Sequence, residues 1–255
     1  MPKLLIALPL LSFVTFAQST QPVAITSAAS TSAGLAPESL ATAFGTFLAT
    51  QTATAQFVPW PTSLGGATIQ ITDSAGVMRL AGLIFVSPSQ INFQIPSGTA
   101  IGPATVSVNN SFGTSVTVRI QGEAPALFSV NGRGIAAATA VALLIPTTRQ
   151  FPVPVFQCVD TPDSCQLVPI DPGLDRPVFL SFYGTGIRGR SSLDNVTVTM
   201  GAVTVKPLYA GPQPQFPGLD QVNVPLPLLL RGAGEVDVVV TVDGIASNPV
   251  KIRVI

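Results

Sequence analysis

Alternating apolar and polar residues in two segments of the chain predict β-strands. In "QINFQ", the apolar residues Ile91 and Phe93 are separated by polar side chains. In "QVNVP", Val222 and Val224 alternate with polar residues in the same way. Because successive side chains of a strand point to opposite faces, each segment is expected to place one face on a core and the other toward water.

These segments belong to longer passages that resemble each other. The passage "SQINFQIPSGTAIGPATVSV" (Ser89–Val108) matches "DQVNVPLPLLLRGAGEVDVVVTV" (Asp220–Val242), and in each a glycine-containing turn leads to a second alternating run. A last alternating run follows at Val116–Ile120 in one copy and at Val250–Val254 in the other. Strands and turns at intervals of about ten residues are typical of a β-sandwich. We interpret the chain as a duplicated module.

A further pair of matching segments lies upstream of these passages. The segments "SLATAFGTFLA" (Ser39–Ala49) and "VFLSFYGTGIR" (Val178–Arg188) each run from a short apolar strand into an aromatic-Gly-Thr sequence, where glycine permits a bend. The predicted fold class is therefore all-β, with two β-sandwiches in tandem. We place the first domain at residues 35–121 and the second at residues 122–255.

The segment between the repeated passages has no sequence match in the first copy. Its apolar run Ile135–Ile145 fits either a buried strand or a short helix, and the prolines that follow favour a strand. We predict that residues 135–170 form a β-hairpin inserted into the second domain. Its tip is expected at the loop that contains Cys158 and Cys165.

Proline positions and the chain end bear on which strands lie at sheet edges. Because proline cannot donate a hydrogen bond to a sheet ladder, Pro225 predicts that the second-copy strand lies at an edge. The terminal segment Val250–Ile255 is another candidate edge, to which a partner chain would pair by strand addition.

The first residues predict a secretory leader. Lys3 precedes an almost unbroken apolar run, Leu4–Phe16, which ends at the small residue Ala17. This is the layout of a signal peptide over residues 1–17, whereas a membrane anchor needs roughly 20 apolar residues. We expect the mature chain, which starts with an N-terminal segment over residues 18–34, to be secreted to the cell exterior or envelope, the periplasm included, with no membrane span.

Cys158 and Cys165 are the two cysteines of the chain. In an exported protein a close pair of this kind is expected to form a local disulfide. A zinc site is the weaker alternative, because two thiolates without any histidine do not complete the usual four ligands. We therefore expect no metal and no cofactor.

Composition argues against several functions. Twelve basic residues balance twelve acidic ones, so nucleic-acid binding, which relies on excess Lys and Arg, is disfavoured. The absence of histidine excludes Ser-His-Asp and Cys-His nucleophile systems. Aspartates gather in the connecting segment at spacings that suit turns better than a calcium loop or a glycosidase pair; they are Asp160, Asp163, Asp171 and Asp175. We expect no catalytic residues, and an unrecognised hydrolase remains a third hypothesis because fold alone does not exclude activity.

One aromatic loop is a candidate binding site. Trp60, the only tryptophan, lies between two prolines in "QFVPWPTSLGG", and Phe57 precedes it. A stiffly held aromatic side chain can stack on a sugar ring, which makes polysaccharide binding a second functional hypothesis. The alternative that we favour is packing of Trp60 at the end of the first sandwich or against the second domain.

Taken together, the motifs resemble a known family. The segments "APESLATAFGTFLA", "FVSPSQINFQIPSGTAIGPATVSV", "APALFSVNGRGIAAA", "FLSFYGTGIRGRSSL" and "GEVDVVVTVDGIASN" resemble the uncharacterised C-terminal module of large secreted acidobacterial proteins, the Solibacter C-terminal family. Each half is also similar to an immunoglobulin-like TIG (IPT) domain. The resemblance extends from about Leu35 to Ile255. The resemblance implies an extracellular or envelope pair of immunoglobulin-like domains without known catalytic activity. We expect a structural, adhesive or protein-interaction role, with envelope or extracellular proteins as partners.

Overall fold

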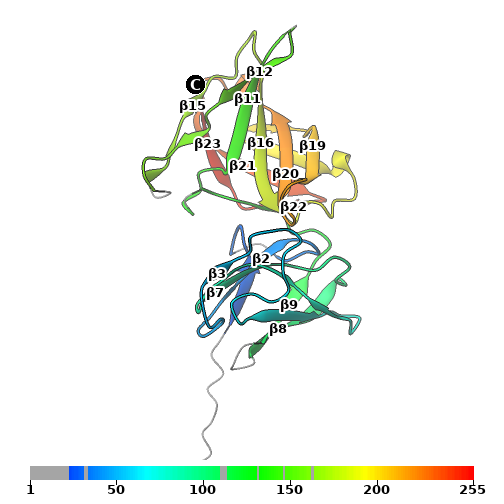
Figure 1. Cartoon of the computed structure of the whole chain (residues 1–255). Coiled ribbons are helices and arrows are strands. Elements are labelled where there is room, and N and C mark those ends of the chain that lie inside the picture. Colours follow the sequence, from blue (N-terminus) through cyan, green and yellow to red (C-terminus); the bar gives the residue numbers. More distant parts are fainter. Residues whose placement is uncertain (1–22, 32–33, 110–113, 131, 146, 162–163) are drawn as a thin grey trace, which may run out of the picture.

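Two β-sandwiches form the protein, stacked one on the other (Figure 1). The computed structural model describes residues 23–31, 34–109, 114–130, 132–145, 147–161 and 164–255. The predicted signal peptide, residues 1–17, lies outside the described residues. The all-β class expected from the alternating pattern is confirmed, because the regular elements are strands apart from short 3-10 turns such as η2 (Leu193–Asn195) and η3 (Leu228–Leu230).

The first sandwich packs a five-stranded sheet against a four-stranded sheet. In the larger sheet the strand order is β1 (Ala24–Ser27), β2 (Leu40–Phe44), β7 (Gln90–Gln94), β6 (Gly82–Val86) and β3 (Ala53–Thr54). In the smaller sheet it is β5 (Met78–Leu80), β4 (Thr68–Thr72), β8 (Gly102–Asn109) and β9 (Thr114–Ile120). The predicted alternation is confirmed, since Ile91 and Phe93 of β7 are fully buried in the core between the sheets.

The second sandwich repeats this plan with additional strands. One sheet has the order β12 (Arg149–Val153), β11 (Ala138–Leu144), β16 (Val178–Thr185), β20 (Asp220–Pro225) and β19 (Tyr209–Pro212), with β10 (Ala126–Leu127) also paired to β16. The other has the order β15 (Pro169–Ile170), β23 (Val250–Val254), β21 (Gly234–Val242), β17 (Val196–Met200) and β18 (Val203–Val205), with β22 (Ile245–Ala246) paired to β21. Val222 and Val224 of β20 are fully buried, as the alternation predicts.

The pairing registers of the two sandwiches agree. Phe44 of β2 lies opposite Gln90 of β7, and Tyr183 of β16 lies opposite Gln221 of β20. The order β1-β2-β7-β6 of the first sandwich thus corresponds to β11-β16-β20-β19 of the second. The order β5-β4-β8-β9 corresponds to β18-β17-β21-β23. The passages that match in sequence therefore hold the same places in the two folds, down to individual residue pairs.

Two segments that the sequence analysis left outside the repeated sandwiches are part of them. The apolar run 135–145 contains a strand, β11 (Ala138–Leu144), as favoured. This strand pairs with β16 in the place that β1 takes beside β2, so it belongs to the plan that both sandwiches share. Its hairpin partner β12 has no counterpart in the first sandwich. Strand β1 lies within the segment 18–34, and its pairing with β2 makes it part of the first sandwich.

The two edge predictions are wrong. Strand β20 lies inside its sheet, between β16 and β19. It tolerates Pro225 because the last residue pair with β19, Tyr209 with Asn223, comes before the proline. Strand β23 is also covered, since Ile255 donates its amide to Ile170 and Ala136 donates to Lys251 on the side away from β21. Strand addition at Val250–Ile255 is therefore blocked by the chain itself.

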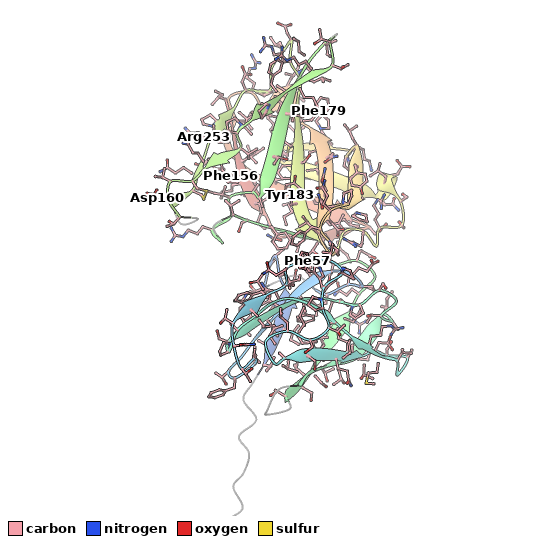
Figure 2. The ribbon with its side chains drawn as sticks, in the orientation of Figure 1. Phe57, Phe156, Asp160, Phe179, Tyr183 and Arg253 are labelled. Atoms are coloured by element: carbon pink, nitrogen blue, oxygen red, sulfur yellow. A yellow bond between two sulfur atoms is a disulfide. The ribbon has the colours of Figure 1, made fainter. Side chains whose placement is uncertain are left out.

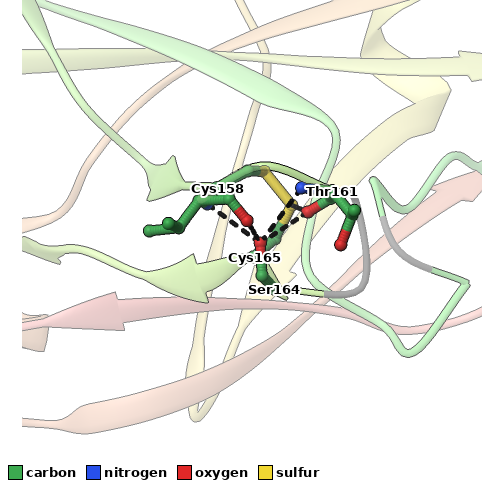
Figure 3. Close-up of a disulfide and its surroundings, with 5 residues drawn as sticks. Cys158, Thr161, Ser164 and Cys165 are labelled. Carbon is green, nitrogen blue, oxygen red and sulfur yellow. Dashed lines mark hydrogen bonds between the residues drawn. A yellow bond between two sulfur atoms is a disulfide. The ribbon is translucent and has the colours of Figure 1, made fainter.

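The predicted disulfide is present. Cys158 and Cys165 are bonded across the loop between β13 (Phe156–Gln157) and β14 (Gln166–Leu167) (Figure 3). Inside this loop the hydroxyl of Ser164 accepts a hydrogen bond from the Val159 amide and donates one to the Thr161 carbonyl. Within the described part of the chain, the structure contains no helix with the length and apolar character needed to cross a membrane.

A buried aspartate organises the turn between β4 and β5. The Asp73 carboxylate accepts hydrogen bonds from the amides of Ala75, Val77 and Ala100, each at 3.0 Å, and pairs with Arg79. The hydrogen bond from Ala100 is the largest cause that lowers the pKa of Asp73 below its ordinary value of 3.8, and the other bonds add to it against the effect of burial. One side chain thus ties the β4–β5 turn to the loop before β8.

Asp73→Asn should destabilise the protein at neutral pH and have less effect in acid. A lowered folded-state pKa means that the carboxylate stabilises the fold above its unfolded-state pKa, about 3.9, and that this contribution disappears as the pH falls through the lower folded value. We expect a lower Tm for the variant at pH 7 and a narrowing Tm difference below about pH 4. The exposed Asp237→Asn, which breaks a surface pair with Lys251, is the control and should change Tm little at either pH. A constant deficit of the Asp73 variant from pH 7 to pH 2 would contradict the prediction.

Candidate functional site

The junction between the two sandwiches brings together more polar and aromatic contacts than the sequence motifs suggest. Loops at one end of the second sandwich lie on the outer face of the β1-β2-β7-β6 sheet of the first (Figure 1). The second sandwich contributes the end of β16 with the loop that follows it and the loop before β20. The first sandwich contributes the start of β2 with the residues before it and the loop before β4. We treat this junction as the candidate functional site.

A threonine hydroxyl forms the closest link. Oγ1 of Thr185 accepts a hydrogen bond from the Leu40 amide at 2.8 Å and donates one to the Gly218 carbonyl, also at 2.8 Å. Thr185 is fully buried, so neither backbone group has water as an alternative partner. One hydroxyl at the end of β16 therefore joins β2 of the first sandwich to the loop before β20 of the second.

A buried carboxylate fixes the shape of the loop that carries Thr185. Asp220 accepts hydrogen bonds from the Ile187 amide at 2.7 Å and the Arg188 amide at 3.2 Å, and Nε of Arg188 donates to its other oxygen at 2.8 Å. Arg188 further donates to the Leu219 carbonyl, and its guanidinium reaches Glu38 of the first sandwich at 3.5 Å. The guanidinium therefore contacts both sandwiches.

The charge of Asp220 is costly to bury, and the loop compensates for it. Burial raises the pKa of the Asp220 carboxyl, while the positive charge of Arg188 and the hydrogen bonds from Ile187 and Arg188 act in the opposite direction. Removing one partner of such a pair leaves an uncompensated charge, at a cost of roughly 3–5 kcal/mol. The arrangement stabilises one loop conformation, in which Arg188 contacts both the Asp220 and the Glu38 carboxylates.

The structure places Trp60 against the second domain. Its ring lies 5.1 Å from that of Phe216, tilted by 60°, and its Nε1 donates to the Pro217 carbonyl at 3.3 Å. Phe57 is not part of this contact: its side chain is 83% exposed, at the level where the sandwiches meet (Figure 2). Of the two aromatic candidates for ligand binding, Trp60 therefore packs against the second sandwich and Phe57 is exposed. Ligand binding by either residue stays a prediction.

A glycine allows the two surfaces to approach. A Cβ atom on Gly218 would lie 2.3 Å from Cδ2 of Leu40. The backbone of Gly218 also has a φ of +89°, a conformation that other residues adopt only with strain. Gly218 therefore permits both the turn before β20 and the contact with β2.

Two hollows remain along the junction. The first, which we call the apolar groove, has a volume of about 340 Å³ and is lined by Ala28, Leu40, Ala41, Ile84 and Asn92 of the first sandwich together with Phe128, Phe216 and Leu219 of the second. The second has a similar volume and is lined by hydroxyl and backbone groups, among them Thr26, Thr42 and Ser129. The apolar groove suits an aliphatic or aromatic group, and the second hollow suits a neutral polar one.

Among the described residues, no cluster of three or more His, Cys, Asp or Glu side chains has the geometry to hold a metal ion. The aspartates of the connecting segment that the sequence suggested for turns include Asp171, which accepts from the Gly173 amide and pairs with Arg231. Asp163 lies outside the described residues. The described contacts across the junction are apolar and aromatic packing, hydrogen bonds and the Arg188–Glu38 ion pair.

The motifs did not reveal the junction, although the repeat contains a signal for it. By register, Arg188 takes the place of Ala49 in the first copy, and Asp220 takes the place of Ser89. Charged residues thus stand in one copy where the other has small neutral ones. Because a duplicated fold requires the same core at both sites, such a difference indicates a role outside the common core.

Gly218→Ala should weaken the junction more than its backbone strain alone explains. The control is Gly244→Ala, since Gly244 has a nearly equal φ of +87° and a Cβ added there would have no atom within 4 Å. Both variants are expected to lose roughly 1–2 kcal/mol from the left-handed backbone. Only Gly218→Ala should add the clash with Leu40, which we expect to appear as a larger loss in urea unfolding. Equal losses in the two variants would contradict the close approach.

Thr185→Val should loosen the sandwiches, because it keeps the shape of the side chain and removes both hydrogen bonds to Leu40 and Gly218. The expected loss of stability is roughly 1–3 kcal/mol. Spin labels on cysteines introduced at the exposed residues Val77 and Leu229, in the two different sandwiches, would report the distance between them. We expect a narrow distance distribution in the parent protein and in Thr185→Ser, and a broader one in Thr185→Val. An unchanged distribution in Thr185→Val would show that the hydroxyl does not hold the junction.

Comparison with known proteins does not assign the chain to a family. A scan against protein-family models finds no match, and a search of the curated proteins finds none either. The resemblance to the Solibacter C-terminal family and to TIG domains stays a prediction.

Proposed function

We propose that this protein is an exported, non-catalytic pair of immunoglobulin-like sandwiches that serves as a rigid structural or adhesive module at the cell envelope and binds other proteins. The proposal combines the predicted signal peptide with the fold. It assigns the chain a role that depends on the shape and surface of the two sandwiches.

The buried junction at Thr185 is the observation that carries the proposal. Flexibly linked domains usually meet through small polar contacts, so relative motion is the ordinary expectation. Here the Leu40 amide, the Glu38 carboxylate and the Trp60 ring of the first sandwich each contact a separate group of the second. A pair held at three points presents its outer surfaces in a constant arrangement, which suits a spacer or a platform for partners.

The Cys158–Cys165 disulfide supports the exported location. Disulfides persist in oxidising compartments such as the periplasm and the cell exterior and are rare in the reducing cytosol. This agrees with the leader predicted over residues 1–17.

Polysaccharide binding is the second candidate, and the exposure of Phe57 favours it. The Phe57 side chain has 83% of its surface accessible and is followed by the half-exposed Val58, so its ring is available to a ligand. Because Trp60 already packs on Phe216, Phe57 is the better candidate to stack on a sugar.

Binding of the mature chain to envelope material tests both candidates. Residues 18–255 would be immobilised and exposed to envelope fractions of the source cells, treated beforehand with either a protease or polysaccharide-degrading enzymes. We expect retention that protease treatment of the fraction abolishes and polysaccharide digestion leaves unchanged. The opposite sensitivity, together with loss of binding in Phe57→Ala, would establish the sugar-binding function instead. Absence of retention by folded protein would overturn both.

A further inference from the structure

The second sandwich has an open hollow on the outer face of its β11-β16-β20-β19 sheet. Its volume is about 360 Å³, and the residues that matter here are Val141, Phe179, Leu180, Leu208 and Asn223. Figure 2 shows Phe179 on the exposed side of this sheet. None of the described residues that line the hollow is charged. We call this surface the acceptor face.

The acceptor face corresponds to the apolar groove of the first sandwich. Phe44 and Tyr183 hold equivalent positions in their sheets, so Leu40, four residues before Phe44, corresponds to Phe179. Asn92 lies opposite Phe85 in the first sandwich, and Asn223 lies opposite Tyr209 in the second, so these two asparagines also correspond. The same correspondence pairs all five residues that the first sandwich contributes to the groove with residues of the acceptor face: Ala28 with Val141, Leu40 with Phe179, Ala41 with Leu180, Ile84 with Leu208, and Asn92 with Asn223. The duplicated fold has therefore formed the same hollow twice.

The two hollows differ in whether the end of another sandwich contacts them. In the first sandwich, Phe128, Phe216 and Leu219 from the end of the next sandwich form one side of the groove. In the second sandwich the equivalent positions are open, and Leu208 and Tyr209 are 61% and 37% exposed. A hollow of apolar and neutral polar residues that lacks such a contact, in the same fold as an equivalent hollow that has it, indicates the kind of partner that fits it, namely the loop end of another sandwich.

We propose that the acceptor face binds the loop end of the first sandwich of a second copy of this chain, in a head-to-tail contact. The equivalent end of the second sandwich is already used within its own chain, which leaves the first-sandwich end as the candidate. There Thr46 holds the place of Thr185, and the following residue, Phe47, is 59% exposed. Phe47 also has a positive φ of 57°, like Gly186 at the same point of the second copy, so the two loop tips share a shape.

The charges of the two surfaces agree with this contact. The loop segments 45–51 and 87–89 of the first-sandwich end contain no charged residue. The acceptor face is likewise uncharged, so docking buries no unpaired charge. Because the two contact surfaces differ, the contact is heterologous, and repetition builds an open chain of molecules or a ring. The proposal rests on the proposed function, in that it names one partner of the rigid module.

Two variants that each block one side test the contact. Leu208→Glu introduces a charge on the acceptor face at an exposed position. Phe47→Asn removes the apolar group from the loop end, and asparagine tolerates the positive φ. In sedimentation velocity of residues 18–255, we expect concentration-dependent association of the parent chain and a dissociation constant raised about tenfold or more in either variant alone. An equimolar mixture of the two variants should form dimers that grow no further, because each mixed pair retains one intact contact.

Leu229→Glu is the matched control, since Leu229 is 85% exposed, lies outside the acceptor face, and should leave association unchanged. Circular dichroism would verify that each variant keeps its fold, and the distance between labels at Val77 and Leu229 would verify the rigid junction in Leu208→Glu and Phe47→Asn. A parent chain that stays monomeric at all concentrations, or a variant mixture that stays monomeric while both variants are folded, would overturn the proposal. Either result, with retention of envelope protein intact, would leave the proposed function standing.

Discussion

The arrangement of the whole molecule depends on the need to satisfy one buried charge. Asp220 lies at the first position of β20 and has no access to water. An unpaired carboxylate in such a place is strongly unfavourable, so the loop after β16 must bring its amides and Arg188 to it. Once this loop has its shape, the Thr185 hydroxyl lies within hydrogen-bonding distance of the Leu40 amide and the Arg188 guanidinium reaches Glu38. The geometry between the sandwiches is thus set by an electrostatic requirement inside one of them.

Much of the fold could be predicted because it depends on local pattern. Alternation predicts β7 and β20, since each contributes buried side chains such as Phe93 and Val224 at every second position. Strand β1 was not predicted because only one of its four side chains, that of Ser27, is buried, and its sequence therefore shows no alternation of apolar and polar residues. The internal position of β20 was missed because it depends on where β19 ends, which Pro225 itself does not reveal.

The junction was harder to predict, because its residues are far apart in sequence and each has an ordinary local explanation. Trp60 between prolines fits a ligand platform as well as the packing role that we favour from the sequence, and only the position of Phe216 identifies its packing partner. Gly218 resembles any turn glycine until Leu40 is placed beside it. Comparison of the two copies was the available route, since a duplicated core makes the departures at Arg188 and Asp220 stand out.

The segment that connects the two sandwiches packs against the loop after β16. Ala124 donates its amide to the Gly186 carbonyl, and a Cβ atom on Gly186 or Gly189 would overlap the carbonyl oxygens of Ala124 or Gly122. Tandem domains joined by a free tether can exchange partners, so that the second half of one molecule docks on the first half of another. Here such domain swapping requires the tether to detach from Gly186 and Gly189 before it can extend. Each molecule is therefore expected to complete its own junction as it folds, even when many copies are close together.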